Sequence, residues 1–199
     1  MDLALAGGVS HISVYALTPE VGTPIYTDYL NGELLSDDEV ADIYDGIRTY
    51  LKEKGFDRYE VSNFAKSGYR SRHNQNYWQR GEYIGVGVSA SSFMENRRFT
   101  NTFKIDEYIN AVIYNKTPEI SSEIIEDKDA RFEFIMLALR TSKGMSISKF
   151  NAEFSTDFDK EYKSVLDKKM RFMERNGDTL KIKDEYLYVQ NDIILSFMK

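Results

Sequence analysis

A strand, a helix and a second strand follow one another in the first third of the chain, and this order constrains the fold more than any other feature. Residues 11–17 (HISVYAL) are rich in β-branched and aromatic residues, which is typical of a strand. Ser36 and Glu39 form a capping box ahead of a helix that Gly55 ends, and residues 58–63 predict the second strand. Such a crossover predicts that the two strands run parallel in one sheet.

Two strands are too few for a complete sheet of this kind, because a parallel sheet normally has several strands and both faces covered. Only a short helix over residues 2–6, ended by Gly7 and Gly8, precedes the first strand. The pattern alone leaves two interpretations open. The chain is the C-terminal piece of a longer α/β protein, or it is a small α+β domain with a short N-terminal helix.

Helices dominate the second half of the chain. The apolar spacing predicts helices over residues 105–114, 127–140, 147–154, 158–175 and 192–198, with a hairpin of strands 179–183 and 186–190 before the last one. Helix, helix, helix, hairpin, helix is the order of a winged-helix-like module. Between residues 141 and 199, however, 11 Lys and Arg are balanced by 10 Asp and Glu. A structural role is therefore expected rather than binding to DNA.

The composition excludes several classes of site and partner. The chain has no cysteine, which rules out disulfides, thiolate zinc sites, a cysteine nucleophile and an iron–sulfur cluster held by this chain. It has two histidines, His11 and His73, which are too few for a multi-histidine metal site. A net charge of −6 argues against nucleic acid as a partner. The chain has no apolar run that could span a membrane and no basic stretch after Met1, so we expect a cytoplasmic protein.

The segment Arg72–Trp78 (RHNQNYW) is the most informative candidate site. Its rings could stack on a flat ligand, its arginine could pair with a carboxylate, and His73 could bind a metal at the ligand's centre. The alternative is an exposed polar loop that Trp78 fixes to the core. Spacing alone favours this alternative, because a lone histidine more often makes structural hydrogen bonds.

Two further features are weaker. Gly85 and Gly87 lie in a predicted strand over residues 83–89, where backbone without Cβ lets a ligand or another strand approach closely. Tight strand packing is the favoured explanation from the pattern. Glu60 lies in the second predicted strand, at the position where α/β barrels hold their active sites, or it is an exposed charge at an edge.

Taken together, these segments resemble the C-terminal half of the oxygen-independent coproporphyrinogen III oxidase-like radical S-adenosylmethionine proteins, in their heme chaperone (HemW) branch. The resemblance covers essentially the whole chain. It is carried by residues 11–20 (HISVYALTPE), 22–24 (GTP), 59–65 (YEVSNFA), 72–78 (RHNQNYW), 81–87 (GEYIGVG), 89–90 (SA), 134–140 (FIMLALR) and 144–146 (GMS).

For the fold, the resemblance implies an α/β protein whose part present here is α+β. Residues 1–95 would be the last βα units of a partial (β/α)6 radical S-adenosylmethionine barrel, with strands at about 11–17, 58–63 and 83–89. Residues 96–199 would be a helical, winged-helix-like C-terminal domain with a small hairpin. Unpaired parallel strands expose edges that favour association, so we expect a homodimer or a strained monomer.

For cofactors, the resemblance implies a [4Fe–4S] cluster and S-adenosylmethionine in the full-length protein. The family's C-x-x-x-C-x-x-C cluster motif is absent here, so no catalytic residue is expected in this chain and it should be inactive alone. Five residues match family positions on the S-adenosylmethionine side of the site: Thr18, Gly85, Gly87, Ala90 and Ser91.

For function, the resemblance implies a chaperone that binds heme and transfers it to a hemoprotein acceptor. The residues that match the heme-binding motif are His73, Asn74, Tyr77 and Trp78, with His73 as the ligand of the heme iron, and Arg72 beside them is also expected at the heme. The first alternative is an oxygen-independent coproporphyrinogen III oxidase or dehydrogenase of porphyrin biosynthesis. The second is an interaction domain without a cofactor.

Overall fold

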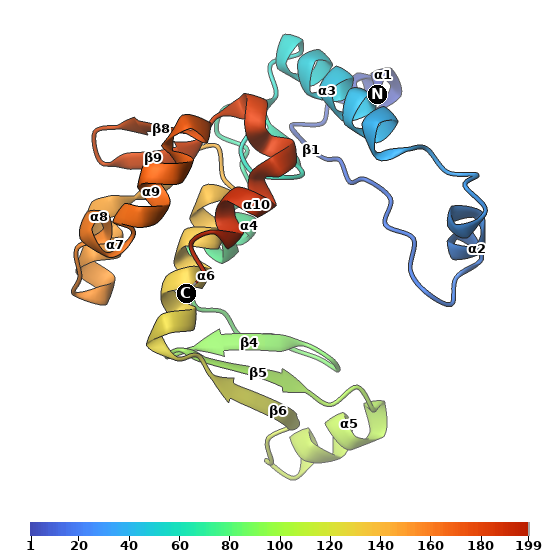
Figure 1. Cartoon of the computed structure of the whole chain (residues 1–199). Coiled ribbons are helices and arrows are strands. Elements are labelled where there is room, and N and C mark those ends of the chain that lie inside the picture. Colours follow the sequence, from blue (N-terminus) through green and yellow to red (C-terminus); the bar gives the residue numbers. More distant parts are fainter. Residues whose placement is uncertain (199) are drawn as a thin grey trace. The chain divides into compact units, whose positions relative to one another are not determined.

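The structure, a computed structural model, describes residues 1–198, which divide into two compact units (Figure 1). The first unit is Met1–Ser71 and the second begins at Arg72. The domain boundary expected between residues 95 and 96 lies inside the second unit, at the turn of a hairpin. Each unit is described by itself.

Helix α3 (Asp37–Glu53) is the main helix of the first unit, and its predicted capping box is confirmed. The Ser36 hydroxyl accepts the backbone N–H of Glu39, and the Glu39 carboxylate accepts the backbone N–H of Ser36 at 2.9 Å. The hydrogen bonds that the Glu39 carboxylate accepts from the Ser36 backbone N–H and from the Ser36 hydroxyl lower the pKa of Glu39 below its ordinary value. The inner face of α3 buries Leu51 against Phe56 and Phe64, which form the core of this unit.

Two short helices complete the first unit. Helix α1 (Asp2–Ala6) is confirmed, and the glycines after it end it as predicted. Helix α2 (Pro24–Leu30) was not predicted, although proline at the first helical position is a common start. Its apolar side chains Tyr29 and Leu30 are exposed.

The small sheet of the first unit differs from the prediction. Its strands are β1 (His11–Ser13), β2 (Asp57–Arg58) and β3 (Asn63–Ala65). Their order is β1-β3-β2 with both pairs antiparallel, so β1 and β2 point the same way but β3 lies between them. The predicted strand over 58–63 is wrong because the chain reverses there, where the N–H of Tyr59 donates to the carbonyl of Asn63 at 3.0 Å. The strand predicted over 11–17 ends at Ser13.

The second unit begins with helix α4 (Arg72–Trp78), followed by an antiparallel sheet that the pattern did not predict. The strands of the sheet are β4 (Ser91–Met94), β5 (Arg97–Asn101) and β6 (Glu119–Ile124), in that order, and α5 (Ile105–Ile113) connects the last two. Glu95 and Asn96 make the β4–β5 turn with φ of 50° and 58°. Glycine usually takes such positions, so the sequence lacks the ordinary hairpin signal.

The predicted strand over residues 83–89 is wrong. Tyr83 makes one isolated bridge with Phe93, and the residues after it are irregular. The alternating Ile84 and Val86 are 66% and 85% exposed. An alternating pattern forms a strand only where a neighbouring strand pairs with it, and none does so among residues 1–198.

The C-terminal module, residues 125–198, combines helices with a third antiparallel sheet of order β7-β9-β8. Its elements are α6 (Asp127–Leu139), β7 (Met145–Ser146), α7 (Ile147–Phe154), α8 (Phe158–Glu161), α9 (Lys163–Lys169), the 3-10 helix η1 (Met170–Phe172), β8 (Met173–Asn176), β9 (Thr179–Ile182), the 3-10 helix η2 (Asp184–Val189) and α10 (Gln190–Leu195). The expected helices over 127–140 and 147–154 are confirmed, and the terminal helix begins two residues earlier than predicted.

The hairpin of this module is shifted along the sequence from its predicted place. The helix predicted over 158–175 gives way to β8, and Asn176 pairs with Thr179 across a tight turn. The two residues of that turn are Gly177 and Asp178, and Gly177 has φ of +57°, so the glycine marks a hairpin rather than a helix end. The strand predicted over 186–190 is wrong, because these residues belong to η2 and α10.

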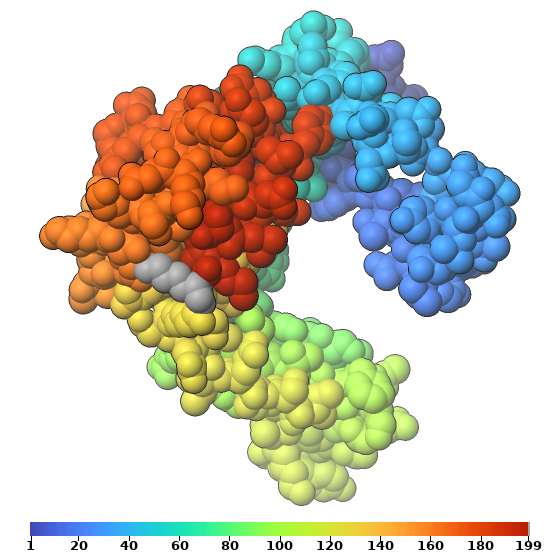
Figure 2. All heavy atoms as spheres, in the orientation of Figure 1, coloured from blue at the N-terminus to red at the C-terminus, as the bar shows by residue number. Residues whose placement is uncertain are grey.

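Aromatic rings fill the core of the C-terminal module, whose orange and red atoms pack closely in Figure 2. Phe150 lies at its centre, with ring centroids 5.2 Å from Phe158 and 6.0 Å from Tyr162. Burial raises the pKa of Tyr162 to about 12. Among residues 1–198, no helix is long and apolar enough to cross a bilayer.

Candidate functional site

Residues 72–78 form a helix, α4, rather than a loop. The helix ends where Arg80 takes a left-handed conformation with φ of 55° and donates its backbone N–H to the Tyr77 carbonyl at 2.9 Å. His73 and Tyr77 are four residues apart and share the exposed face of α4, whereas Asn74 and Trp78 share a half-buried face. The helix therefore presents the imidazole and the phenol ring together to solvent.

Four rings, which we call the aromatic row, continue from α4 into β4. They are His73, Tyr77, Tyr83 and Phe93. His73 meets Tyr77 edge-on at a centroid separation of 4.6 Å, and Tyr77 meets Tyr83 edge-on at 4.6 Å. Tyr83 and Phe93 are 6.4 Å apart. Edge-to-face pairs at such separations are favourable, so the row orients the imidazole at its exposed end.

The two histidines have different surroundings. The Nε2 atom of His11 lies 2.8 Å from the hydroxyl of buried Tyr59, as expected of a structural histidine. His73 is exposed, and its imidazole makes no hydrogen bond or ion pair within the described chain. A ring nitrogen with a free lone pair can bind a metal ion. His73 is therefore the histidine that is available to a ligand.

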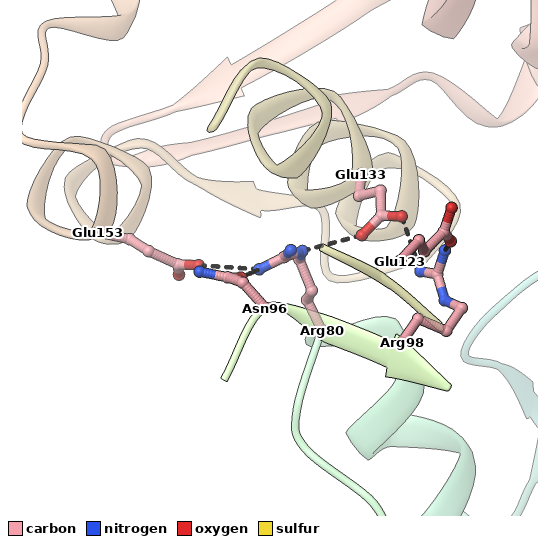
Figure 3. Close-up of polar contacts among 6 residues, drawn as sticks. All are labelled: Arg80, Asn96, Arg98, Glu123, Glu133 and Glu153. Atoms are coloured by element: carbon pink, nitrogen blue, oxygen red, sulfur yellow. Dashed lines mark hydrogen bonds and ion pairs between the residues drawn. The ribbon is translucent and has the colours of Figure 1, made fainter. Parts of the chain in front are cut away.

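A charged cluster, which we call the arginine–glutamate triad (Figure 3), lies beside Phe93, the last ring of the aromatic row. It consists of Arg80, Arg98 and Glu133 of α6. Arg80 Nε donates to Glu133 Oε2 at 3.1 Å, and Arg98 Nη2 donates to Glu133 Oε1 at 2.7 Å. Both guanidinium groups lie over the Phe93 ring, at 4.8 and 5.9 Å from its centroid. The hydrogen bond to Glu133 raises the pKa of Arg98.

The triad was missed by sequence reasoning. Arg80 and Glu133 are 53 positions apart, and no local pattern links them. The Arg80 side chain is 7% exposed and also donates to the Asn96 side chain at 2.9 Å. Only the tertiary structure shows that this arginine is buried and paired.

The glycines after α4 are explained by the chain's own packing. A Cβ on Gly85 would lie 2.3 Å from the carbonyl oxygen of Ser91 and 2.9 Å from the Cβ of Ala90, so these three predicted residues do meet. Gly87 has φ of +108°, and its carbonyl accepts a hydrogen bond from the Asn101 side chain at 2.9 Å. The role of these residues toward S-adenosylmethionine stays a prediction.

Two predicted residues belong to the first unit. Thr18 is exposed in the irregular segment after β1. Glu60 is 1% exposed, so the interpretation as an exposed charge at an edge is wrong. Its Oε2 atom accepts the backbone N–H of Ser62 at 3.1 Å, while its Oε1 atom has no partner in the described structure. Glu60 thus holds the turn between β2 and β3.

The donor set does not fit an iron–sulfur cluster. The chain contains no cysteine, and residues 1–198 hold no group of three or more His, Asp or Glu side chains that could bind a metal. A metal bound by this chain would therefore need most of its ligands from another molecule, as heme iron has the four nitrogens of its porphyrin.

Known proteins resemble this chain in sequence and in fold. Residues 125–190 match the family model described as the HemN C-terminal domain. A protein named heme chaperone HemW, from Lactococcus lactis subsp. lactis, is 29% identical over 194 residues, which are 94% of this chain and 50% of that protein. The chain spans about half the length of the curated relatives it matches.

Similarity is higher over a shorter stretch of a mitochondrial relative. The bovine protein named radical S-adenosyl methionine domain-containing protein 1 is 46% identical over 82 residues, 40% of this chain and 19% of that protein. A solved structure, titled as coproporphyrinogen III oxidase (HemN) from Escherichia coli, a radical SAM enzyme, has a TM-score of 0.66. It covers 84% of this chain and 43% of that chain at 14% identity, which shows a shared mixed α+β fold.

Proposed function

We propose that this chain has a role in heme binding and transfer. Its C-terminal region is HemN-like, and homologues named heme chaperone HemW match most of its length. Helix α4 would hold the heme, with His73 as the ligand of its iron. A hemoprotein would be the acceptor. The assignment of the barrel, the transfer reaction and the acceptor rests on the relatives.

The observation that carries this proposal is the state of the His73 imidazole. It is exposed, makes no hydrogen bond or ion pair within the described chain, and is oriented by the ring of Tyr77 beside it. Heme is flat and apolar, with an iron that accepts imidazole and two carboxylates at its edge. Arg72 is exposed next to His73, where its guanidinium group could pair with one of those carboxylates.

We extend the proposal to the cofactors that the radical S-adenosylmethionine relatives imply. A cluster and S-adenosylmethionine supply radical chemistry when bound. The residues of this chain cannot hold the cluster, so we assign no step of that chemistry to these residues. Thr18, Gly85, Gly87, Ala90 and Ser91 remain our proposed S-adenosylmethionine side.

Hemin titration followed by the Soret band tests the heme site. We expect a saturable Soret shift for the wild-type chain and its loss or marked weakening in His73→Ala. His11→Gln, which alters the structural histidine, should bind hemin like the wild type. Equal hemin affinity in His73→Ala and wild type would contradict the assignment of the ligand, and the lack of any wild-type Soret shift would contradict heme binding itself.

A further inference from the structure

Ion pairs join the segment after the proposed heme helix to the C-terminal module. Glu133 makes the shortest of them, and Glu153 of α7 pairs with Arg80 at 3.7 Å. Glu133 lies on α6, within the region matched by the HemN C-terminal family, and its two oxygens bind two arginines that come from outside that region. Arg80 follows α4 by two residues, and Arg98 lies on β5. One side chain of the module thus contacts both the segment after the helix and the sheet beside it (Figure 3).

The contacts continue without a gap from Glu133 to His73. The guanidinium of Arg80 covers the Phe93 ring, Phe93 bridges to Tyr83 through backbone hydrogen bonds of 2.9 Å, and Tyr83 contacts Tyr77. Tyr77 in turn contacts His73. A displacement of Arg80 therefore acts on the C-terminal end of α4, and the contacts between rings connect it to His73 near the N-terminal end.

The backbone of Arg80 supports a specific role for its side chain. Its φ of 55° is left-handed, where glycine is favoured and other residues are strained. Glycine at this position would relieve the strain but would lose every interaction of the arginine side chain. Here those interactions are the ion pair with Glu133, whose side chain is 16% exposed, a hydrogen bond to the Asn96 side chain and a second ion pair with Glu153.

We infer that Glu133 is a positioning residue for the heme site: by pairing with Arg80 and Arg98 it fixes helix α4, and with it His73, against the C-terminal module. This inference rests on the proposed function for its ligand, but the positioning itself can be measured without heme. Trp78, the last residue of α4, is the single tryptophan of the chain. Its fluorescence therefore reports on this helix alone.

The test compares Glu133→Gln with Glu161→Gln in the full chain. Glu161 is the matched control, because it makes a similarly half-buried pair in the same module, with Arg131 at 2.8 Å, and its side chain is 18% exposed. We expect Glu133→Gln to increase acrylamide quenching of Trp78 and to weaken hemin binding about tenfold, which corresponds to about 1.4 kcal/mol. Glu161→Gln should leave both values unchanged. Arg80→Lys, which keeps the charge but not the forked geometry, serves as a second variant if Glu133→Gln does not fold.

The outcomes separate the inference from the proposed function. Unchanged Trp78 quenching in Glu133→Gln, or an equal change in Glu161→Gln, would overturn the positioning role. Increased quenching with unchanged hemin affinity would also overturn it, because the helix would then move without affecting the site. If the wild-type chain binds no hemin, the proposed function fails, while the Trp78 measurement still decides whether Glu133 holds α4.

Discussion

The ring of His73 stands nearly perpendicular to the ring of Tyr77, at an interplanar angle of 78° and a centroid separation of 4.6 Å. This relationship joins an exposed imidazole to a row of rings that ends on the buried side of a sheet. It gives the imidazole a preferred orientation before any ligand arrives, which lowers the entropy lost on binding.

Replacing Tyr77 should therefore weaken heme binding without removing the iron ligand. We expect Tyr77→Leu to lower hemin affinity by a factor of about 2–10, because a ring pair contributes about 0.5–1.5 kcal/mol. Tyr77→Phe keeps the ring and should bind hemin like the wild type. Equal affinities of the Leu and Phe variants in Soret titrations would show that the edge contact has no part in binding.

Replacing Arg80 by glycine shows whether its backbone strain or its side-chain ion pair contributes more to the stability of the fold. Glycine should regain about 1–2 kcal/mol of left-handed strain, but breaking a buried ion pair costs about 3–5 kcal/mol. We expect Arg80→Gly to lower the free energy of unfolding by about 2 kcal/mol in urea denaturation.

Ser155→Gly is the matched control for this variant. Ser155 is also left-handed, with φ of 49°, but it is an exposed residue at the end of α7. Its replacement should raise the free energy of unfolding by about 1–2 kcal/mol, because it relieves the same left-handed strain without breaking an ion pair. A stabilised Arg80→Gly chain would mean that the triad contributes less than the backbone strain.

A methyl group at Gly85 should be destabilising because of the chain's own packing. The added Cβ would meet the Ser91 carbonyl, which as backbone cannot easily move, and overpacking of this kind costs about 1–3 kcal/mol. Gly46→Ala provides the contrast, since Gly46 lies inside α3 with nothing within 4 Å of an added Cβ. That variant should gain about 0.5–1 kcal/mol. A melting temperature of Gly85→Ala equal to or above that of the wild type would refute the packing explanation.

Asp178 should make the stability of the C-terminal module depend on acid pH. Its carboxylate accepts hydrogen bonds from the Ser146 hydroxyl at 2.6 Å, the Ser148 backbone at 2.7 Å and the Ser148 hydroxyl at 2.9 Å. These bonds lower the pKa of Asp178 below its ordinary value of 3.8. A lowered folded-state pKa gives stability that is present above the unfolded-state pKa and is lost as the pH falls through the folded-state pKa.

We therefore expect Asp178→Asn to lower the melting temperature at neutral pH, with a difference from wild type that shrinks once the pH falls below 3.8. Circular dichroism melts across this range measure the effect. A constant difference at all pH values would show that the charge of Asp178 is not involved.

Local signals were predicted well because they depend on neighbouring residues. Ser36 and Glu39 lie three residues apart, so their mutual hydrogen bonds could be anticipated, and the helix they begin is confirmed. The Asn176-Gly177 pair was a clear turn signal, but it was assigned to a helix end instead of the hairpin it forms. The β4–β5 turn could not be recognised, since Glu95 and Asn96 adopt positive φ without a glycine.

The sequence by itself determined the helices α3, α6 and α7, the lack of cluster ligands, and the segment that carries His73, because spacing, caps and composition are properties of nearby residues. Only the tertiary structure decided that β3 lies between β1 and β2, that residues 84–89 do not form a strand, and that Glu133 binds Arg80 and Arg98. These features depend on pairings between distant residues. Strand order and buried ion pairs follow from which surfaces meet in the folded chain, and short-range patterns do not record that choice.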